Sequence, residues 1–296
     1  MSILIHQSRQ YFDFGRRMGD MLVGRYLARR ARRLLAEGHA PLAIFAHDYI
    51  GQEISLKGRF EDEELAALFD FLAPFADRFA AQVALDVGAN IGNHSLFFAG
   101  RFATVHSFEP NPRTFALLAA NAALNPRIVS HRTALGEAPG ELSLRFDPAN
   151  VGEATLRSDL TGRSLVEVTV PVGRLDDLVD PALDIGFVKI DVEGFEASVL
   201  RGACRLLSRL PVIAFEQNRE AFADGRSEVA EMLSALGYRL CVLQKRDVGG
   251  GLSLLHKLSG GIRYDIVEVE TLVAGIYPMI VAVSPTDLSL LRSRQA

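Results

Sequence analysis

Short apolar runs alternate with longer amphipathic segments over the part of the chain beyond residue 80. Each run ends in glycine, proline or polar residues, as buried strands typically do. Segments such as TFALLAANAALN, between the runs, have apolar residues at helical spacing. This alternation predicts an α/β sheet. Its predicted core strands are VALDVG, TVHSFEP, IVSHRTALG, DIGFVKIDVEG and PVIAFEQN.

Four further strands are predicted around this core. ELSLRF and EVTVPV are expected to form edge or hairpin strands, whereas GYRLCVLQ and YPMIVAVSP lie near the end of the chain. A connection containing Gly249, Gly250 and Gly251 joins the last two, and it has no amphipathic segment long enough for a crossover helix. Parallel neighbours need such a crossover, so we predict an antiparallel pair at one edge of the sheet.

The first 60 residues follow a different pattern. Residues 15–37 predict a helix with apolar residues along one broad side and seven arginines on its other faces. Such a helix either packs on the main domain with a solvated basic face or makes peripheral membrane contact through residues 16–33. PLAIFAHDYI and QEISLKG predict short strands or irregular structure with turns at Asp48 and Gly58, and residues 61–79 predict another helix.

Composition excludes several classes of protein. Of 296 residues, 49% are hydrophobic and 23% are charged, which is typical of a globular protein. A net charge of −4 argues against a chain built mainly to bind nucleic-acid backbones. Two cysteines and scattered histidines predict neither a disulfide framework nor a structural zinc site. Without a signal-peptide pattern or an apolar run of membrane-spanning length, we expect a cytoplasmic protein.

A glycine-containing loop follows the first core strand, in the sequence DVGANIGNHS. Gly88 and Gly92 allow the backbone to turn sharply into a helix and to approach a ligand closely. The loop is expected at the carboxyl end of a central strand, where doubly wound sheets bind ligands. Glu109 ends the second strand about twenty residues later, where a carboxylate can accept hydrogen bonds from the two ribose hydroxyls of an adenosine group.

The spacing in this loop distinguishes between two cofactors that contain adenosine. Nicotinamide dinucleotides favour G-x-G-x-x-G, which places backbone NH groups around a pyrophosphate. Here the spacing is G-x-x-x-G, and Asp86 precedes the loop. The Asp86 carboxylate would repel a pyrophosphate but attract the ammonium group of a methionine moiety. The sequence therefore favours S-adenosylmethionine (SAM) over NAD.

Several longer segments match motifs of one known family. They are ALDVGANIGNHSLFFA, VHSFEPNPRTFALLAANAALN, HRTALGE, VPVGRLDDL and FVKIDVEGFEASVLRGA. Together they resemble the FkbM family of methyltransferases from about residue 61 to residue 285, and K-I-D-V-E-G is the most specific part. The resemblance implies a Rossmann-like class I methyltransferase, with a seven-stranded, mostly parallel α/β sheet and a reversed last strand. We expect this methyltransferase domain over residues 61–296, after an N-terminal helical extension over residues 1–60.

The resemblance also implies a SAM site and a type of reaction. Asp86, Gly88, Asn90 and Gly92 are expected at the methionine end of the cofactor, Glu109 at its ribose, and Asn111 and Ala134 near its adenine. The family is associated with O-methylation, often of sugars or polyketide-type natural products. We therefore expect a small-molecule or glycan acceptor, bound partly by the segment before residue 61.

Three carboxylates are candidates for chemistry on the acceptor hydroxyl. Asp191 and Glu193 follow the fourth core strand and Glu216 lies near the end of the fifth, where an acceptor would meet the methyl group. An alcohol is a poor nucleophile at neutral pH, so a carboxylate that takes its proton helps transfer. We predict that Asp191 positions or deprotonates the hydroxyl, and that Glu193 and Glu216 orient the acceptor. Alternatively, Glu193 stabilises a helix N-terminus and Glu216 pairs with an arginine.

The sequence leaves three alternatives open: a magnesium site, a nucleic-acid substrate and a non-catalytic role. We predict no metal site, although three carboxylates at one rim could hold Mg²⁺ through oxygen ligands. A methyltransferase that modifies base amino groups typically carries Asp/Asn-Pro-Pro-aromatic after the fourth strand, where this chain has Asp191-Val-Glu-Gly, and we expect no nucleic-acid partner. A non-catalytic SAM-binding scaffold is a further alternative, supported mainly by the basic N-terminal helix.

Overall fold

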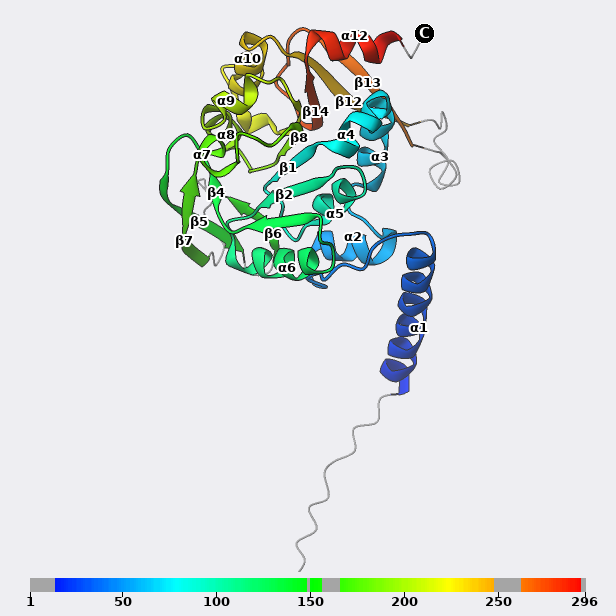
Figure 1. Cartoon of the computed structure of the whole chain (residues 1–296). Coiled ribbons are helices and arrows are strands. Elements are labelled where there is room, and N and C mark those ends of the chain that lie inside the picture. Colours follow the sequence, from blue (N-terminus) through cyan, green and yellow to red (C-terminus); the bar gives the residue numbers. More distant parts are fainter. Residues whose placement is uncertain (1–13, 148–149, 156–165, 248–261, 294–296) are drawn as a thin grey trace, which may run out of the picture.

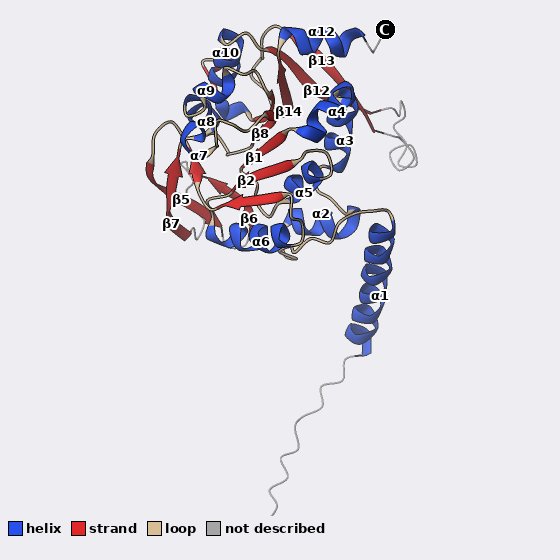
Figure 2. Ribbon diagram, viewed as in Figure 1, coloured by secondary structure: helices blue, strands red, loops and turns tan. Residues whose placement is uncertain are grey.

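A mixed eight-stranded sheet crosses the molecule, with helices on both of its faces (Figure 1 and Figure 2). The computed structural model describes residues 14–147, 150–155, 166–247 and 262–293. Five parallel strands form one part of the sheet, in the spatial order β3 (Ile128–His131), β2 (Thr104–Phe108), β1 (Val83–Val87), β8 (Ile185–Ile190) and β9 (Val212–Gln217). The sheet continues through β14 (Tyr277–Val283), β12 (Arg239–Asp247) and β13 (Ile262–Val269), each antiparallel to its neighbour.

This strand order confirms the expected Rossmann-like class I fold, with β14 as the reversed last strand. The late antiparallel pair is also confirmed, because β12 pairs with β14. The prediction of seven strands needs one correction, since β13 adds an eighth at the sheet edge. Its sequence IRYDIVEV alternates apolar or aromatic residues with charged ones only over the first five positions, so it gives a weak signal inside a long connection.

Side chains along the central strands alternate between two apolar layers. Ala84 and Phe187 point to one layer, while Leu85 and Val188 on the same two strands point to the other. The first layer is covered by α3 (Asp62–Phe71), η1 (Ala73–Phe75), α4 (Ala76–Ala81), α5 (Asn93–Ala99) and α12 (Pro285–Ser293). The second is covered by α7 (Leu175–Leu178), α8 (Glu196–Arg201), α9 (Cys204–Leu207) and α10 (Glu228–Ala235).

A smaller four-stranded sheet lies beside the carboxyl ends of the central strands (Figure 2). Its spatial order is β4 (Ala134–Leu135), β7 (Val166–Gly173), β5 (Gly140–Asp147) and β6 (Asn150–Thr155). The predicted strands ELSLRF and EVTVPV pair here as β5 and β7. The predicted third strand is divided, so that β3 belongs to the large sheet and β4 to the small one. The helix α6 (Pro112–Ala123) joins β2 to β3.

From residue 14 to residue 58, the N-terminal segment forms the helices α1 (Phe14–Ala36) and α2 (Tyr49–Lys57). The prediction of a strand or irregular structure for QEISLKG is therefore wrong, because all but its last residue belongs to α2. Asp48 and Gly58 are the two ends of α2: the Asp48 carboxylate accepts a hydrogen bond from the backbone NH of Gly51 at 2.6 Å, and Gly58 adopts φ of 91°. Caps of this kind stabilise a helix in which some residues, such as glycine and isoleucine, have low helix propensity.

The helix α1 extends away from the rest of the molecule (Figure 1). Its C-terminal end packs near α2, where Leu34 is buried and the Arg30 guanidinium donates a hydrogen bond to the backbone oxygen of Leu56. Farther along, Leu22 and Tyr26 are 59% and 58% exposed, so only the end of the helix packs on the body of the protein. No helix within the described residues is long and apolar enough to cross a membrane.

Candidate active site

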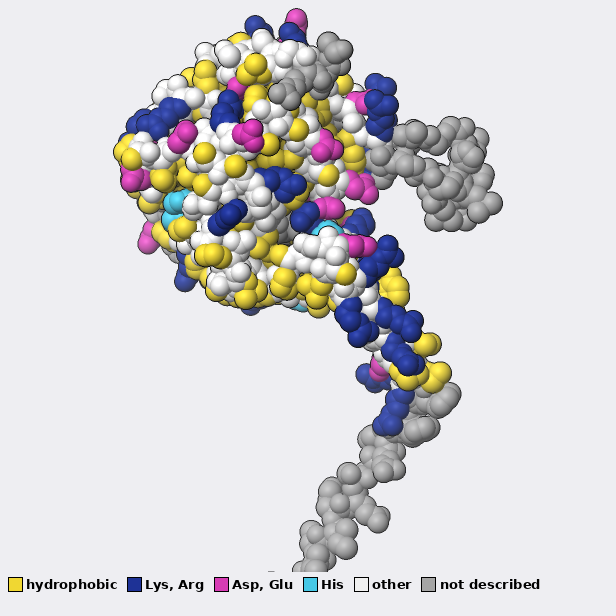
Figure 3. Space-filling model, turned by 45° about the vertical axis from the view of Figure 1, so that its right-hand side comes forward, with side chains coloured by type: hydrophobic (Ala, Val, Ile, Leu, Met, Phe, Trp, Pro, Cys, Tyr) yellow, Lys and Arg dark blue, Asp and Glu magenta, His cyan; other side chains and the backbone are white. Residues whose placement is uncertain are grey.

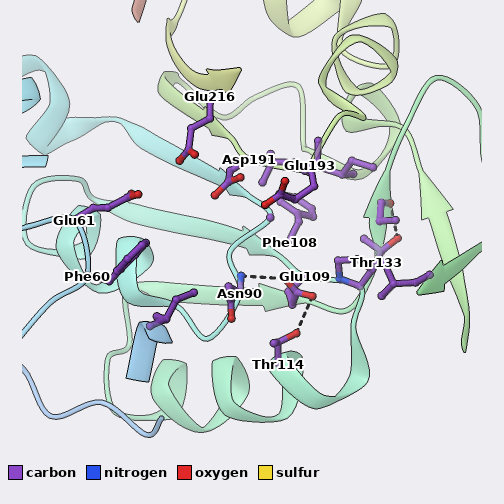
Figure 4. Close-up of a pocket in the computed structure, with 18 of the residues that line it drawn as sticks. Phe60, Glu61, Asn90, Phe108, Glu109, Thr114, Thr133, Asp191, Glu193 and Glu216 are labelled. Carbon is purple, nitrogen blue, oxygen red and sulfur yellow. Dashed lines mark hydrogen bonds between the residues drawn. The ribbon is translucent and has the colours of Figure 1, made fainter. Parts of the chain in front are cut away.

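A cavity of about 270 Å³ opens at the carboxyl ends of β1, β2, β8 and β9. Doubly wound sheets bind their ligands at this edge. The loops that follow these strands contribute Gly88, Asn90 and Asp191 to its lining. Asn90 and Asp191 are labelled in Figure 4. The small sheet contributes Ala134, and the N-terminal segment contributes residues from α2 onward. The cavity is therefore built from elements far apart in the sequence.

The loop after β1 passes very close to the loop after β8. Gly88 has φ of 82°, and a Cβ atom at this position would lie 1.7 Å from the backbone oxygen of Asp191. Only glycine tolerates both this φ and this approach. Gly92 adopts φ of 89° at the N-terminus of α5, where a Cβ would lie 2.8 Å from Leu118. Both glycines thus occupy the sharp turn for which the sequence required them.

Glu109 lies just after β2, with only 7% of the residue exposed. Its Oε2 accepts a hydrogen bond from the backbone NH of Asn90 at 3.0 Å. Its Oε1 accepts two more, from the backbone NH of Asn111 and from the hydroxyl of Thr114, each at 2.8 Å. Burial raises the pKa of Glu109 to about 7, although these donors act in the opposite direction. Glu109 therefore ties the β1 and β2 loops together beside the cavity (Figure 4).

Three of the predicted cofactor residues, Asp86, Gly92 and Asn111, lie behind the cavity lining. The Asp86 carboxylate is fully buried and accepts a hydrogen bond from the Ser95 hydroxyl at 2.6 Å, and Ser95 accepts one from Ser107. Asn111 caps α6. These residues support the lining, and a direct contact between Asp86 and an ammonium group stays a prediction. The other four predicted residues line the cavity: Gly88, Asn90, Glu109 and Ala134.

Asp191, Glu193 and Glu216 meet at the rim of the cavity (Figure 4). A buried lysine that the sequence analysis did not assign lies with two of them. Lys189 Nζ is 2.8 Å from Oδ2 of Asp191 and 3.8 Å from Oε1 of Glu216. Glu216 therefore has a lysine partner, where the alternative interpretation expected an arginine. The alternative role for Glu193 was to stabilise the N-terminus of the following helix, α8. The acid in the first turn of α8 is Glu196, whose carboxylate accepts a hydrogen bond from the backbone NH of Gly194 at 2.9 Å.

Burial and charge act in opposite directions in this group. Burial lowers the pKa of Lys189, but the carboxylates of Asp191 and Glu216 outweigh it, so the net pKa is raised and the lysine stays protonated. Burial and the Asp191 carboxylate raise the pKa of Glu216 well above its ordinary value, against the opposing effect of Lys189. Within the part of the chain that the structure describes, no group of three His, Cys, Asp or Glu residues has the arrangement of a metal site.

The N-terminal segment completes the first cavity, and its expected contact with the acceptor stays a prediction. Tyr49, Ile50 and Phe60 contribute to its lining together with Glu61. Glu61 has φ of 56°, and its Oε2 lies 3.2 Å from Nε2 of His94. The place of Glu61 in the cavity lining could not be expected from the sequence, because Glu61 precedes a run of acidic residues that is typical of the solvated start of a helix.

Comparison with known proteins decides the family. The model of the FkbM methyltransferase domain matches residues 86–240, which is more than half of the chain. The chain belongs to the FkbM methyltransferase family. This agrees with the motifs and with the strand order.

Curated and solved relatives show how far the likeness of this FkbM-family chain extends. Methyltransferase 1 of Beauveria bassiana is 31% identical over 154 residues, which covers 44% of this chain and 61% of that protein. Hexuronic acid methyltransferase AglP of Haloferax volcanii is 32% identical over 136 residues, covering 44% and 54%. The crystal structure of methyltransferase FkbM from Methylobacillus flagellatus has 21% identity and a TM-score of 0.33, over 67% of this chain and 48% of that one. The chain thus spans less than two thirds of each.

Proposed function

We propose that the chain is a SAM-dependent methyltransferase that methylates a hydroxyl group of a sugar or another small molecule. The observation that carries this proposal is the meeting of Gly88, Glu109 and Asp191 in one cavity, each from the end of a different central strand. Membership of the FkbM family supports it. The relative AglP, a hexuronic acid methyltransferase by name, supports a sugar-type acceptor.

The charge of the cavity suits SAM better than NAD. No described residue in the lining is Lys, Arg or His. Five lining residues are acidic: Glu61, Glu109, Asp191, Glu193 and Glu216. SAM carries an ammonium and a sulfonium cation against one carboxylate, whereas NAD carries an anionic pyrophosphate. An acidic lining attracts the first and repels the second, which supports the cofactor that the loop spacing favours.

Glu109 is placed to hold the ribose. A carboxylate has about four lone-pair sites. Hydrogen bonds from Asn90, Asn111 and Thr114 already occupy three of these sites on Glu109. One site is left, so we expect Glu109 to accept one ribose hydroxyl and not both. Ala134 is assigned to the adenine side because of the family resemblance.

When bound, SAM supplies an electrophilic methyl group on a cationic sulfur. The residues of the chain then have to position the acceptor hydroxyl and take its proton. Asp191, held by Lys189 at 2.8 Å, is suited to orient the hydroxyl. Glu216 has a raised pKa and is therefore a stronger base once deprotonated. Either Glu216 or Asp191 is therefore proposed to take the proton of the acceptor hydroxyl. Glu193 is proposed to orient the acceptor.

A nucleic-acid acceptor and a non-catalytic scaffold role both receive less support. A nucleic-acid strand is a polyanion, and the acidic rim around Asp191, Glu193 and Glu216 would repel it. A scaffold that only binds SAM would not need these carboxylates at the methyl end of the cavity.

We also propose that α1 contacts an anionic membrane surface, as suits an acceptor carried on a glycolipid. Arginine side chains gather along α1 (Figure 3). Among them, Met21, Leu22 and Tyr26 are 46%, 59% and 58% exposed. Anionic headgroups attract the arginines, while exposed apolar side chains enter the lipid interface.

Transfer of a labelled methyl group tests the proposed function. The full chain is incubated with methyl-labelled SAM and a panel of sugars, glycolipids and polyketide-type alcohols. We expect at least one acceptor to be labelled, and Asp191→Asn to lower kcat by about 100-fold or more because it removes the charge that orients the hydroxyl. The control is Asp177→Asn, an acid on α7 whose side chain is 57% exposed and lies outside the cavity. Equal turnover by the two variants would remove Asp191 from the mechanism.

A further inference from the structure

A second cavity, of about 220 Å³, adjoins the first. Asp191, Glu193 and Glu216 line both, so the two cavities meet at the carboxylate rim. None of the seven residues predicted to bind the cofactor is among the described residues that line the second cavity. A molecule in the second cavity would therefore meet a methyl group held in the first at these three side chains.

The reversed strand β14 builds one wall of this second cavity. Because β14 is antiparallel to β9, its first residue, Tyr277, pairs with the last residue of β9, Gln217. Both lie at the same sheet edge as the rim carboxylates. Asn218 and the short turn η2 (Arg219–Ala221) follow directly after β9, and Asn218 and Ala221 add to the lining. The wall thus lies where the last parallel strand, β9, pairs with the reversed strand β14.

This wall combines apolar and hydrogen-bonding surface. Tyr277 and Ile276 provide an aromatic ring and an aliphatic side chain, and Gln217 and Asn218 provide amides. Gln217 is 3% exposed, and its Oε1 accepts a hydrogen bond from the Ser227 hydroxyl at 2.5 Å, while its Nε2 has no hydrogen-bond partner among the described residues. A sugar ring likewise has an apolar C–H face and a hydroxylated edge, so the two kinds of surface match.

The second cavity presents carboxyl groups and no exposed cation among its described lining residues. Asp191, Glu193, Glu196 and Glu216 line it, and no described lining residue is Lys, Arg or His. Lys189 lies beside Asp191 and Glu216, but its side chain is only 3% exposed. Burial raises the pKa of Glu196 and Glu216, which reduces their negative charge near neutral pH. An acceptor with a carboxylate or phosphate would still meet carboxyl oxygens here and would find no exposed cation to pair with. Neutral hydroxyls can instead donate hydrogen bonds to the same carboxylates.

We propose that this second cavity is the acceptor subsite, and that it selects neutral polyhydroxylated acceptors, such as unsubstituted sugar rings, over sugar acids and sugar phosphates. The proposal rests on the proposed function. In the transfer, a bond forms between the acceptor oxygen and the methyl carbon, and the carbon–sulfur bond breaks with its electron pair going to sulfur. The hydroxyl proton passes to a rim carboxylate. The relative AglP, a hexuronic acid methyltransferase by name, would differ from this chain in the charge of its acceptor.

Matched glycosides test this selection. The full chain is given methyl-labelled SAM and aryl glycosides of several sugars, each as the neutral sugar, the 6-carboxylate and the 6-phosphate. We expect at least one neutral glycoside to be methylated, with kcat/KM about tenfold or more above that of its charged counterparts. A preference for a charged member, or no labelling of any neutral member by a chain that binds S-adenosylhomocysteine (SAH), would overturn the proposal.

Variants of Tyr277 test the location of the subsite. Tyr277→Ala should raise the KM of the methylated acceptor by about tenfold and leave the Kd of SAH unchanged, whereas Tyr277→Phe keeps the ring and should retain a KM near that of the parent chain. Val273→Ala is the control, since this side chain is 73% exposed and lines neither cavity. An unchanged acceptor KM in Tyr277→Ala, or an equal loss of SAH affinity, would show that the subsite lies elsewhere.

The two proposals fail in different ways. A chain that binds neither SAM nor SAH refutes the proposed function itself. A chain that binds SAH and methylates sugar acids in preference to neutral sugars refutes the acceptor proposal alone.

Discussion

At the residue scale, the candidate site is organised around one buried cation. Lys189 lies between Asp191, two positions along the chain, and Glu216 on the neighbouring strand. The attraction holds together two carboxylates that would otherwise repel each other, and both line the two cavities. Their exposed fractions, 29% for Asp191 and 31% for Glu216, leave both side chains accessible from the cavities. The proton chemistry of the rim therefore depends on Lys189.

Replacing Lys189 by Met removes this cation but keeps an unbranched side chain of similar length. Lys189 lowers the pKa of Glu216, so its loss should raise that pKa further. If Glu216 takes the proton of the acceptor, the pH at which transfer becomes fast should increase by about one unit or more. The pH profile of methyl transfer measures this shift, with the exposed Lys245→Met on β12 as control. A lower rate with an unchanged profile would contradict the coupling.

Glu109 should make cofactor affinity depend on pH. Burial raises its pKa to about 7, so the group changes from mostly protonated at pH 6 to mostly charged at pH 8. A ribose hydroxyl donates more strongly to the charged form, so affinity should increase as the pH rises through 7. Titration calorimetry should show the Kd of SAH falling by up to about tenfold between pH 6 and pH 8. Glu109→Gln should abolish this dependence and Glu231→Gln, an exposed acid on α10, should retain it. A dependence that survives in Glu109→Gln would exclude this residue as its source.

The sequence predicted some residues of the site better than others, for a physical reason. Asp191 and Glu216 could be predicted because each lies at the end of a buried strand, and parallel strands end at one edge. Lys189 could not be assigned, because one of its partners lies on another strand. Glu61 was missed because its position depends on how the N-terminal segment folds back over the sheet.

At the element scale, the approach of two strand-end loops shapes the cavity. Gly88, after β1, lies directly against the backbone of Asp191, after β8. These loops can approach so closely because β1 and β8 are hydrogen-bonded neighbours in the sheet. A side chain at position 88 would overlap the backbone of Asp191 and force the two loops apart. The integrity of the site and the stability of the fold are therefore linked at Gly88.

Gly88→Ala should destabilise the protein and weaken cofactor binding. The new Cβ would overlap the backbone oxygen of Asp191, and alanine at φ of 82° adds backbone strain. Together these effects should cost about 2 kcal/mol or more. Chemical denaturation measures the loss, and SAH titration measures the effect on the site. In the control Gly140→Ala, the added Cβ has no atom within 4 Å. Equal stability of the two variants would refute the close approach.

The exposed part of α1 should mediate membrane contact in the full chain. Co-sedimentation with vesicles of phosphatidylcholine and phosphatidylserine should show binding that decreases as salt is added, because arginines make the first contact. Replacing Leu22 and Tyr26 with Ser should reduce binding about tenfold, whereas Leu236→Ser, which changes an exposed residue after α10, should have little effect. Salt-insensitive binding, or equal binding by both variants, would exclude this role for α1.

Helices and strands with a clear pattern of hydrophobic and polar residues could be predicted, and those with a weak pattern could not. The apolar runs of β1, β8 and β9 identified buried strands because every residue but one in them is buried. The helix α2 was missed because YIGQEISLK contains glycine and two isoleucines, and its stability comes from the caps at Asp48 and Gly58. The edge strand β13 was missed because its alternation of apolar or aromatic residues with charged ones covers only the first five positions.

At the scale of the whole molecule, two cavities share one rim of carboxylates. The parallel part of the sheet builds the first cavity, and the reversed strand β14 adds a wall to the second. A fold with this division can hold a cofactor on one side and an acceptor on the other. The strand order could be expected from the family motifs, but the second cavity could not, since it depends on pairing between Gln217 and Tyr277.

Titration calorimetry of the full chain with SAM, SAH and NAD⁺ tests the central claim most directly. The acidic lining and the hydrogen-bonded Glu109 predict saturable binding of SAM and SAH with Kd values in the micromolar range, and no measurable binding of NAD⁺. Binding of NAD⁺ with equal or greater affinity would contradict the assignment of the cofactor. If SAM and SAH do not bind, either alone or in the presence of neutral glycosides, the chain is not a SAM-dependent methyltransferase.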